Sequence, residues 1–83
     1  MEWETCFQKR ILDRGYDYYF DERVEDLRIT SNRIKAVVYG THPYHVEIKL
    51  NGNRIIGMSC DCPYALDGHN CKHMAAVLYD WER

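Results

Sequence analysis

The fourteen residues from Cys60 to His73 constrain this chain more than any other stretch. They contain three of its four cysteines and two of its four histidines, in the order C-x-C, eight residues, C-x-H. Three thiolates and one imidazole are a donor set that zinc binds tetrahedrally, at about 2.3 Å to sulfur and about 2.0 Å to nitrogen. Four protein donors complete that coordination. The pattern therefore predicts one structural zinc ion, held by Cys60, Cys62, Cys71 and His73.

The residues between the donors suit this geometry. Pro63 fixes its own φ near −65° and so ends a strand directly after the C-x-C pair. Asp67-Gly68 is typical of a turn. Asn70 is a favourable N-cap, so we expect a helix that starts at Cys71. The first turn of a helix has free N–H groups, which favour a thiolate.

Other histidines and the fourth cysteine are alternatives to weigh. His69 with the three cysteines would also give three sulfurs and one nitrogen, so the residues alone leave His69 and His73 both open as the fourth ligand. Cys6 lies far away in the sequence, within the first expected helix, and we expect a semi-buried free thiol there. His42 and His45 have no acid cluster nearby, and we expect ordinary surface or turn residues.

The pattern resembles the SWIM zinc finger, whose signature is C-x-C-x(n)-C-x-H. Pro63 after the second cysteine and Lys72 between the last two donors strengthen the match. The upstream residues that resemble the segment preceding the finger in bacterial members are Arg14-Gly15-x-x-Tyr18, Val24 and Gly40-x-x-x-Tyr44-x-Val46-x-Ile48. The resemblance thus spans about residues 10 to 80.

SWIM zinc fingers occur in bacterial helicases of the chromatin-remodelling class, in Mutator-type transposases and in some signalling and recombination proteins. The resemblance implies one bound zinc ion and favours His73 over His69, because the family pattern ends in C-x-H. It also allows DNA binding, since those helicases and transposases act on DNA.

Length and charge limit the remaining possibilities. The 83 residues suit a single domain, 1–83, whose small core would benefit from a metal. Eleven basic and thirteen acidic residues give a formal net charge of −2, which lacks the positive excess of a typical nucleic-acid binder. No apolar run approaches the roughly 18 residues of a membrane span, and the acidic N-terminus is unlike a signal peptide. We expect an intracellular, cytoplasmic protein, where such a cluster binds metal rather than forming disulfides.

Apolar residues recur with helical spacing at both ends of the chain. Trp3, Phe7 and Ile11 predict a helix over residues 3 to 14, which Gly15 would end. A second helix is expected over about 71 to 82, with the apolar stripe Met74, Val77, Leu78 and Trp81 packed on a sheet.

Between these helices the apolar residues alternate with polar ones, as in half-buried strands. Four strands are expected: one from Val24 in which Leu27 and Ile29 share a face, then 33–39, 44–50 and 54–59. Asn51-Gly52-Asn53 is the strongest hairpin signal. The predicted fold class is α+β, with an N-terminal helix, an antiparallel meander of about four strands and a zinc-anchored C-terminal helix.

We expect a binding module and no enzyme, because four ligands leave the zinc no open position for a substrate. The first expectation is contact with protein partners or with other domains, within or alongside a nucleic-acid-processing protein, with no membrane and no small-molecule substrate. The aromatic cluster at residues 16 to 20 would supply core and rim packing or a partner surface.

The alternative is a DNA-binding finger. Five basic residues would supply its phosphate contacts: Arg33, Lys35, Lys49, Arg54 and Lys72. The acidic residues Glu47 and Asp61 interrupt this set. A third option is redox sensing through thiolate oxidation and zinc release.

Overall fold

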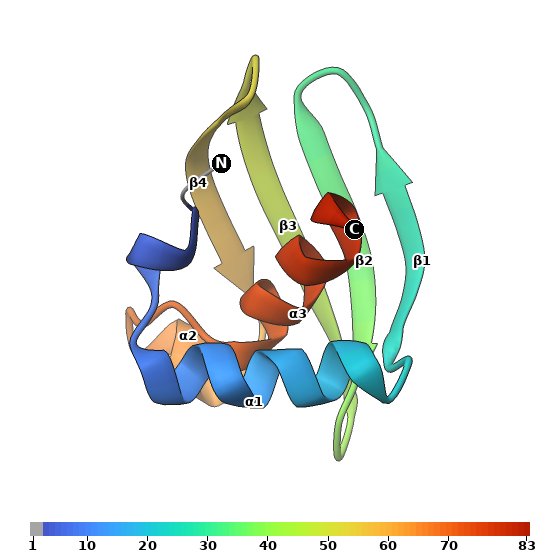
Figure 1. Cartoon of the computed structure of the whole chain (residues 1–83), viewed down its shortest axis with the longest axis vertical. Helices are drawn as coiled ribbons and strands as arrows, with labels where there is room; N and C mark the ends of the chain where they lie inside the picture. The colour runs from blue at the N-terminus through green and yellow to red at the C-terminus, as the bar shows by residue number, and fades with distance from the viewer. Residues whose placement is uncertain (1–2) are drawn as a thin grey trace.

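The computed structural model describes residues 3–83 and confirms the predicted α+β class, with helices packed on a four-stranded antiparallel sheet (Figure 1). In chain order the elements are the 3₁₀ helix η1 (Trp3–Cys6), α1 (Lys9–Phe20), β1 (Val24–Ile29), β2 (Arg33–Tyr39), β3 (Pro43–Asn51), β4 (Arg54–Cys60), α2 (Pro63–Leu66) and α3 (Lys72–Glu82).

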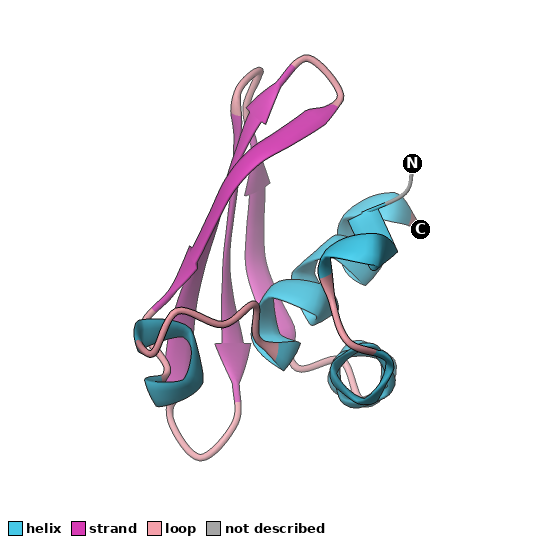
Figure 2. Ribbon diagram, turned by 90° about the vertical axis from the view of Figure 1, so that its left-hand side faces the viewer, coloured by secondary structure: helices cyan, strands magenta, loops and turns pink. Residues whose placement is uncertain are grey.

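The sheet is a simple meander in which each strand pairs with the next, in the order β1-β2-β3-β4. The predicted Asn-Gly turn joins β3 to β4, and Gly52 adopts φ 64° there, as such a turn requires. Alternate residues of β2 and β3 are buried on one face: Ile34, Ala36, Val38, Val46, Ile48 and Leu50. Figure 2 shows α1 and α3 on the same side of the sheet, so this face meets the helices.

The first strand departs from the predicted alternation. Leu27 is half-buried, whereas Ile29 is 54% exposed, although Ile29 pairs with the buried Ile34 and so lies on the same face of the sheet. The register with β2 shifts between Glu25 and Arg28, and Asp26 adopts φ 54° at this irregularity. A bulge adds one residue to a strand and turns the following side chains over. Val24 and Leu27 are the residues of β1 that pack against the core.

The first helix also differs from expectation, because Gly15 does not end it. A short 3₁₀ turn precedes α1, and α1 then runs without interruption from Lys9 to Phe20, taking in the aromatic residues 16 to 20. Gly15 is buried where α1 crosses α3, and a Cβ there would lie 2.6 Å from Ala75 Cβ and 2.9 Å from the Lys72 carbonyl oxygen. Gly15 is therefore a close-packing residue, since only a residue without a side chain lets the two backbones approach this far.

The C-terminal helix α3 is the central element of the core. It packs against α1 and against all four strands, and its residues 73 to 78 are all buried. The predicted stripe holds at Met74, Val77 and Leu78, while Trp81 is only partly buried. The C-terminal end of α3 is linked to η1, because Trp3 Nε1 donates a hydrogen bond of 3.1 Å to Glu82 Oε2. None of the helices within residues 3–83 has the length and apolar character needed to cross a bilayer.

The Gly15 crossing gives a first testable prediction. Gly15→Ala should lower the free energy of unfolding by about 1–3 kcal/mol, because the added methyl group overpacks a contact made with backbone atoms that cannot move aside. This loss should appear even though alanine favours a helix by about 1 kcal/mol over glycine. Urea unfolding of the zinc-loaded protein would measure it.

Gly57→Ala is the matched control. Its added methyl group would meet nothing closer than Lys49 Cδ at 3.7 Å, which is an ordinary contact. Equal stabilities for the Gly15→Ala variant and the parent protein would contradict the close-packing role of this residue.

Candidate metal centre

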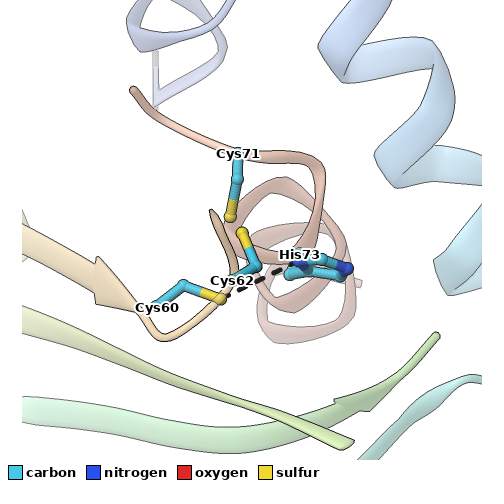
Figure 3. A group of neighbouring side chains, drawn as sticks. All are labelled: Cys60, Cys62, Cys71 and His73. Atoms are coloured by element: carbon cyan, nitrogen blue, oxygen red, sulfur yellow. Dashed lines mark hydrogen bonds between the residues drawn. The ribbon is translucent and has the colours of Figure 1, made fainter. Parts of the chain in front are cut away.

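Four side chains converge at one end of the sheet, where β4 meets α3 (Figure 3). Cys60 is the last residue of β4, Cys62 caps α2, Cys71 caps α3, and His73 lies in the first turn of α3. One donor atom from each of the four lies within 4.8 Å of the others, and all four residues are buried. The structure thus gathers the four side chains that the sequence pattern singled out.

The path between the first two donors depends on a short helix that the sequence did not predict. Cys62 has extended φ and ψ and serves as the N-cap of α2, where its Sγ accepts a hydrogen bond from the Ala65 N–H at 3.4 Å. Pro63 occupies the first helical position, which tolerates proline because that N–H has no partner in the helix. A cysteine is not a favoured N-cap in sequence rules, and for that reason the signal was missed.

The start of α3 also differs from expectation. Cys71, and not Asn70, is the N-cap residue, with φ −101° and ψ 168°. The Asn70 side chain instead donates a 2.9 Å hydrogen bond to the Cys6 carbonyl oxygen. Its role as a helix cap was therefore a wrong prediction, because a partner distant in sequence takes its amide group. The contact ties the loop before α3 to the end of η1.

The electrostatics of the three thiols show why this site needs a cation. A shared hydrogen bond places the first negative charge on Cys71, whose pKa falls to about 4, while the Cys60 thiol keeps its proton and its pKa is raised. Burial raises the pKa of Cys62. Without a metal the pocket therefore resists holding three thiolates. A divalent cation removes this conflict, since it neutralises the sulfurs that it binds.

His73 is oriented as a metal ligand would be. Its Nδ1 lies 3.8 Å from Cys60 Sγ, close to the roughly 3.6 Å between nitrogen and sulfur donors in a tetrahedral zinc site. The Tyr44 ring stacks on the imidazole at 4.4 Å, and the Tyr18 ring meets it at 86° and 5.4 Å. His73 Nε2 is buried and, within residues 3–83, has no hydrogen-bond partner. The ring is therefore held by packing, with Nδ1 facing the sulfurs.

Tyr18 and Tyr44 were not foreseen as supports of this histidine. Their positions in the sequence do not indicate that role, because Tyr18 lies in α1 and Tyr44 in β3, both outside the stretch that contains the donors. Only the packing of α1 across α3 brings Tyr18 to the imidazole.

Asp61, which lies between the first two cysteines, links the end of β4 to β3. Asp61 accepts hydrogen bonds from the His45 backbone N–H at 2.9 Å and, through its other carboxylate oxygen, contacts His45 Nδ1 at 3.1 Å. Partial desolvation acts to raise the pKa of the Asp61 carboxyl, but the contacts with His45 outweigh it and leave the pKa below its usual value. His45 is thus an exposed residue of β3 that holds Asp61 in place.

The comparisons with known proteins agree with this geometry. Residues 44–82 match the family model of the SWIM zinc finger. This segment is a SWIM zinc finger. It contains all of β3 except Pro43, together with β4, α2 and the whole of α3, and its four-residue cluster fits one zinc ion. Searches of curated proteins and of solved structures found no match.

The helix α1 and the first two strands lie outside the matched finger. Their resemblance to the segment that precedes SWIM fingers in bacterial members stays a prediction. Structurally they are joined to the finger, because α1 crosses α3 at Gly15 and Tyr18 touches His73.

Cys6 and His69 both lie outside the cluster of donors. Cys6 is a free thiol, but it is exposed, so the expectation of a semi-buried side chain was wrong. His69 is exposed in the loop before α3 and stacks on Tyr64 at 4.5 Å, and it is not one of the clustered donors.

The five basic residues considered for phosphate contacts do not form one surface. Lys35 and Arg33 lie on the sheet face opposite the helices, where Arg33 pairs with Glu47. Lys72 lies on the helical side, with its Nζ 5.2 Å from the centre of the Tyr18 ring. There it shares a pocket of about 260 Å³ with Arg10 and Arg14.

A pair of substitutions tests the donor set. Cys71→Ser should lower zinc affinity by roughly 100-fold or more, because even residues that only hydrogen-bond to a zinc ligand are worth about 10–100-fold. The melting temperature should fall as well, because a weakened site no longer links the start of α3 to the end of β4. Competition with a chromophoric chelator would measure affinity, and elemental analysis should give one zinc per chain for the parent protein.

His69→Ala is the control, because its ring is exposed and contacts only Tyr64 among the rings of residues 3–83. Its zinc affinity should equal that of the parent protein. Loss of metal from this variant, or an unchanged melting temperature for Cys71→Ser, would show that the fourth ligand or the role of Cys71 is misassigned.

Proposed function

We propose that this chain is a zinc-stabilised protein-interaction module and not an enzyme, and that it works within or alongside a nucleic-acid-processing protein. Zinc bound by Cys60, Cys62, Cys71 and His73 has a structural role, which the closed set of four buried donors supports. The resemblance of the finger to those of bacterial helicases supports the nucleic-acid-processing context.

The observation that carries the interaction role is an exposed group of aromatic rings on the helices. Phe20 is 71% exposed and Tyr16 is 47% exposed, and the two rings stack on each other at 6.1 Å. Burying one such side chain contributes roughly 1.5–3 kcal/mol, so leaving Phe20 in water forgoes much of that stabilisation. Exposed apolar groups gathered in one place are typical of partner surfaces.

The zinc site makes this surface possible. The ion would fix the start of α3 to the end of β4, and α1 in turn rests on α3 through Gly15. Tyr16 touches Tyr79 of α3 at 5.4 Å, so the aromatic group depends on the crossing of the two helices. Metal removal should therefore abolish partner binding together with the fold.

Site-specific photo-cross-linking tests this proposal. A benzophenone amino acid at position 20 should give a discrete protein conjugate in cells of the source organism, identified by mass spectrometry and reproduced with the purified partner. The same probe at position 31, an exposed residue in the turn between β1 and β2, is the control and should not capture that protein. Equal capture at both positions, or no protein conjugate at position 20, would contradict the proposal.

A second candidate function is DNA binding, which the pocket between α1 and α3 favours. Arg10, Arg14 and Lys72 line this pocket and no carboxylate does. If each cation met one phosphate, the logarithm of the affinity should fall with the logarithm of salt at a slope of about −3, and Arg14→Ala should reduce it by about 1. Lys35→Ala, on the opposite sheet face, is the control. Absence of binding to a labelled DNA panel at low salt and micromolar protein would remove this candidate.

A further inference from the structure

Four rings form a continuous patch where α1 and the second half of α3 meet; we call Tyr16, Tyr19, Phe20 and Tyr79 the aromatic surface. Tyr79 is its centre, with the ring of Tyr16 at 5.4 Å and that of Tyr19 at 6.1 Å. Beneath them Trp3 meets Tyr79 edge-on at 4.8 Å and is itself buried. The buried rings hold the exposed ones in place, so the surface is preorganised.

Carboxylates surround this surface. Asp13 and Asp17 precede Tyr16 and Phe20 by three residues on α1, which puts them on the same helical face. Burial raises the pKa of the Tyr79 phenol, and the carboxylates of Glu4, Asp13 and Glu82 raise it further. Negative charge from η1, α1 and α3 thus reaches the central ring.

Little positive charge offsets these acids. Lys9 pairs with Asp13 at 3.2 Å, and Arg83 pairs with Asp80 at 3.4 Å. In the part of the chain that the structure describes, no basic side chain pairs with Glu4, Asp17 or Glu82. The basic residues Arg10 and Arg14 line the pocket beside the metal cluster instead. On α1 each of these arginines lies three residues before an aspartate, but neither forms an ion pair with it among the described residues.

Aromatic faces and carboxylates together match one kind of partner. Lysine and arginine side chains are attracted to the faces of tyrosine and phenylalanine rings and pair with carboxylates. Their long aliphatic stems also cover apolar surface. Phosphate groups and acidic peptides would be repelled by the same carboxylates. The charge complementarity therefore selects a cationic segment.

We infer that the aromatic surface binds a lysine- or arginine-rich segment of a protein partner. This inference rests on the proposed interaction role and adds the chemistry of what is bound. Phe20 and Tyr16 supply exposed ring area, and Asp17 and Glu82 supply negative charge at its edge that no basic side chain of residues 3–83 pairs with.

A peptide panel tests the inference with the zinc-loaded, ¹⁵N-labelled full chain. Three peptides of equal length would be compared, with lysine and arginine, glutamate, or serine at the variable positions of a glycine-containing sequence. The cationic peptide should shift the amide resonances of residues 13 to 20 and of Tyr79, and the other two should not. The shifts should diminish as salt increases, because exposed charge pairs are screened.

Exposed substitutions keep the test independent of folding. Phe20→Ala should weaken binding of the cationic peptide roughly two- to fivefold, the range expected for losing one exposed cation–ring contact. Asp17→Asn should weaken it by a smaller factor that vanishes at high salt. Leu66→Ala is the control, since Leu66 is 74% exposed on α2, away from the aromatic surface, and its variant should bind as the parent protein does.

Three results would overturn the inference. The first is equal binding of all three peptides, or shifts confined to the sheet face of Lys35 and Glu47. The second is movement of the same resonances with protein concentration alone, which would show that a second copy covers the surface. The third is a protein cross-linked at position 20 through an acidic or apolar segment; the interaction role would then stand while its cationic chemistry fails.

Discussion

The burial of three thiols in one cluster is the constraint on which the rest of this structure depends. Cys60, Cys62 and Cys71 lie with His73 in one small volume, and all four side chains are buried. The pKa of Cys60 and that of Cys62 are both raised there, so ionisation of all three thiols is unfavourable without a cation. The family match and the donor chemistry both indicate zinc. One ion then converts an unfavourable cluster into the link between the sheet and its central helix.

The N-terminal elements extend this link to the whole domain. Gly15 lets α1 approach the backbone of α3, and Tyr18 packs edge-on against the metal-facing histidine. Trp3 donates a hydrogen bond to Glu82 at the end of α3, and Asn70 donates one to the carbonyl oxygen of Cys6. The finger and the helix that precedes it are thus one packed unit, although the family match covers only residues 44–82.

The helix α1 contributes to two different surfaces of the molecule. One presents aromatic rings among carboxylates, and the other places Arg10 and Arg14 beside the metal cluster. A small domain with little net charge can in this way have two surfaces of opposite character. The arrangement explains why net charge alone says little about partners, since a formal −2 conceals both surfaces.

The sequence by itself determined the three clustered cysteines, the strand meander and the Asn-Gly turn, and it narrowed the fourth donor to His69 or His73, because each of these rests on residues close together in the chain. Tertiary structure alone decided what depends on distant partners. Gly15 sits mid-helix because α3 lies against it, and Asn70 is drawn from its capping role to the Cys6 carbonyl. The irregularity at Asp26 shifts the alternation of β1 by one residue between Val24 and Leu27. Local patterns fix spacing and periodicity, whereas which groups meet across the core is settled only when the helices pack on the sheet.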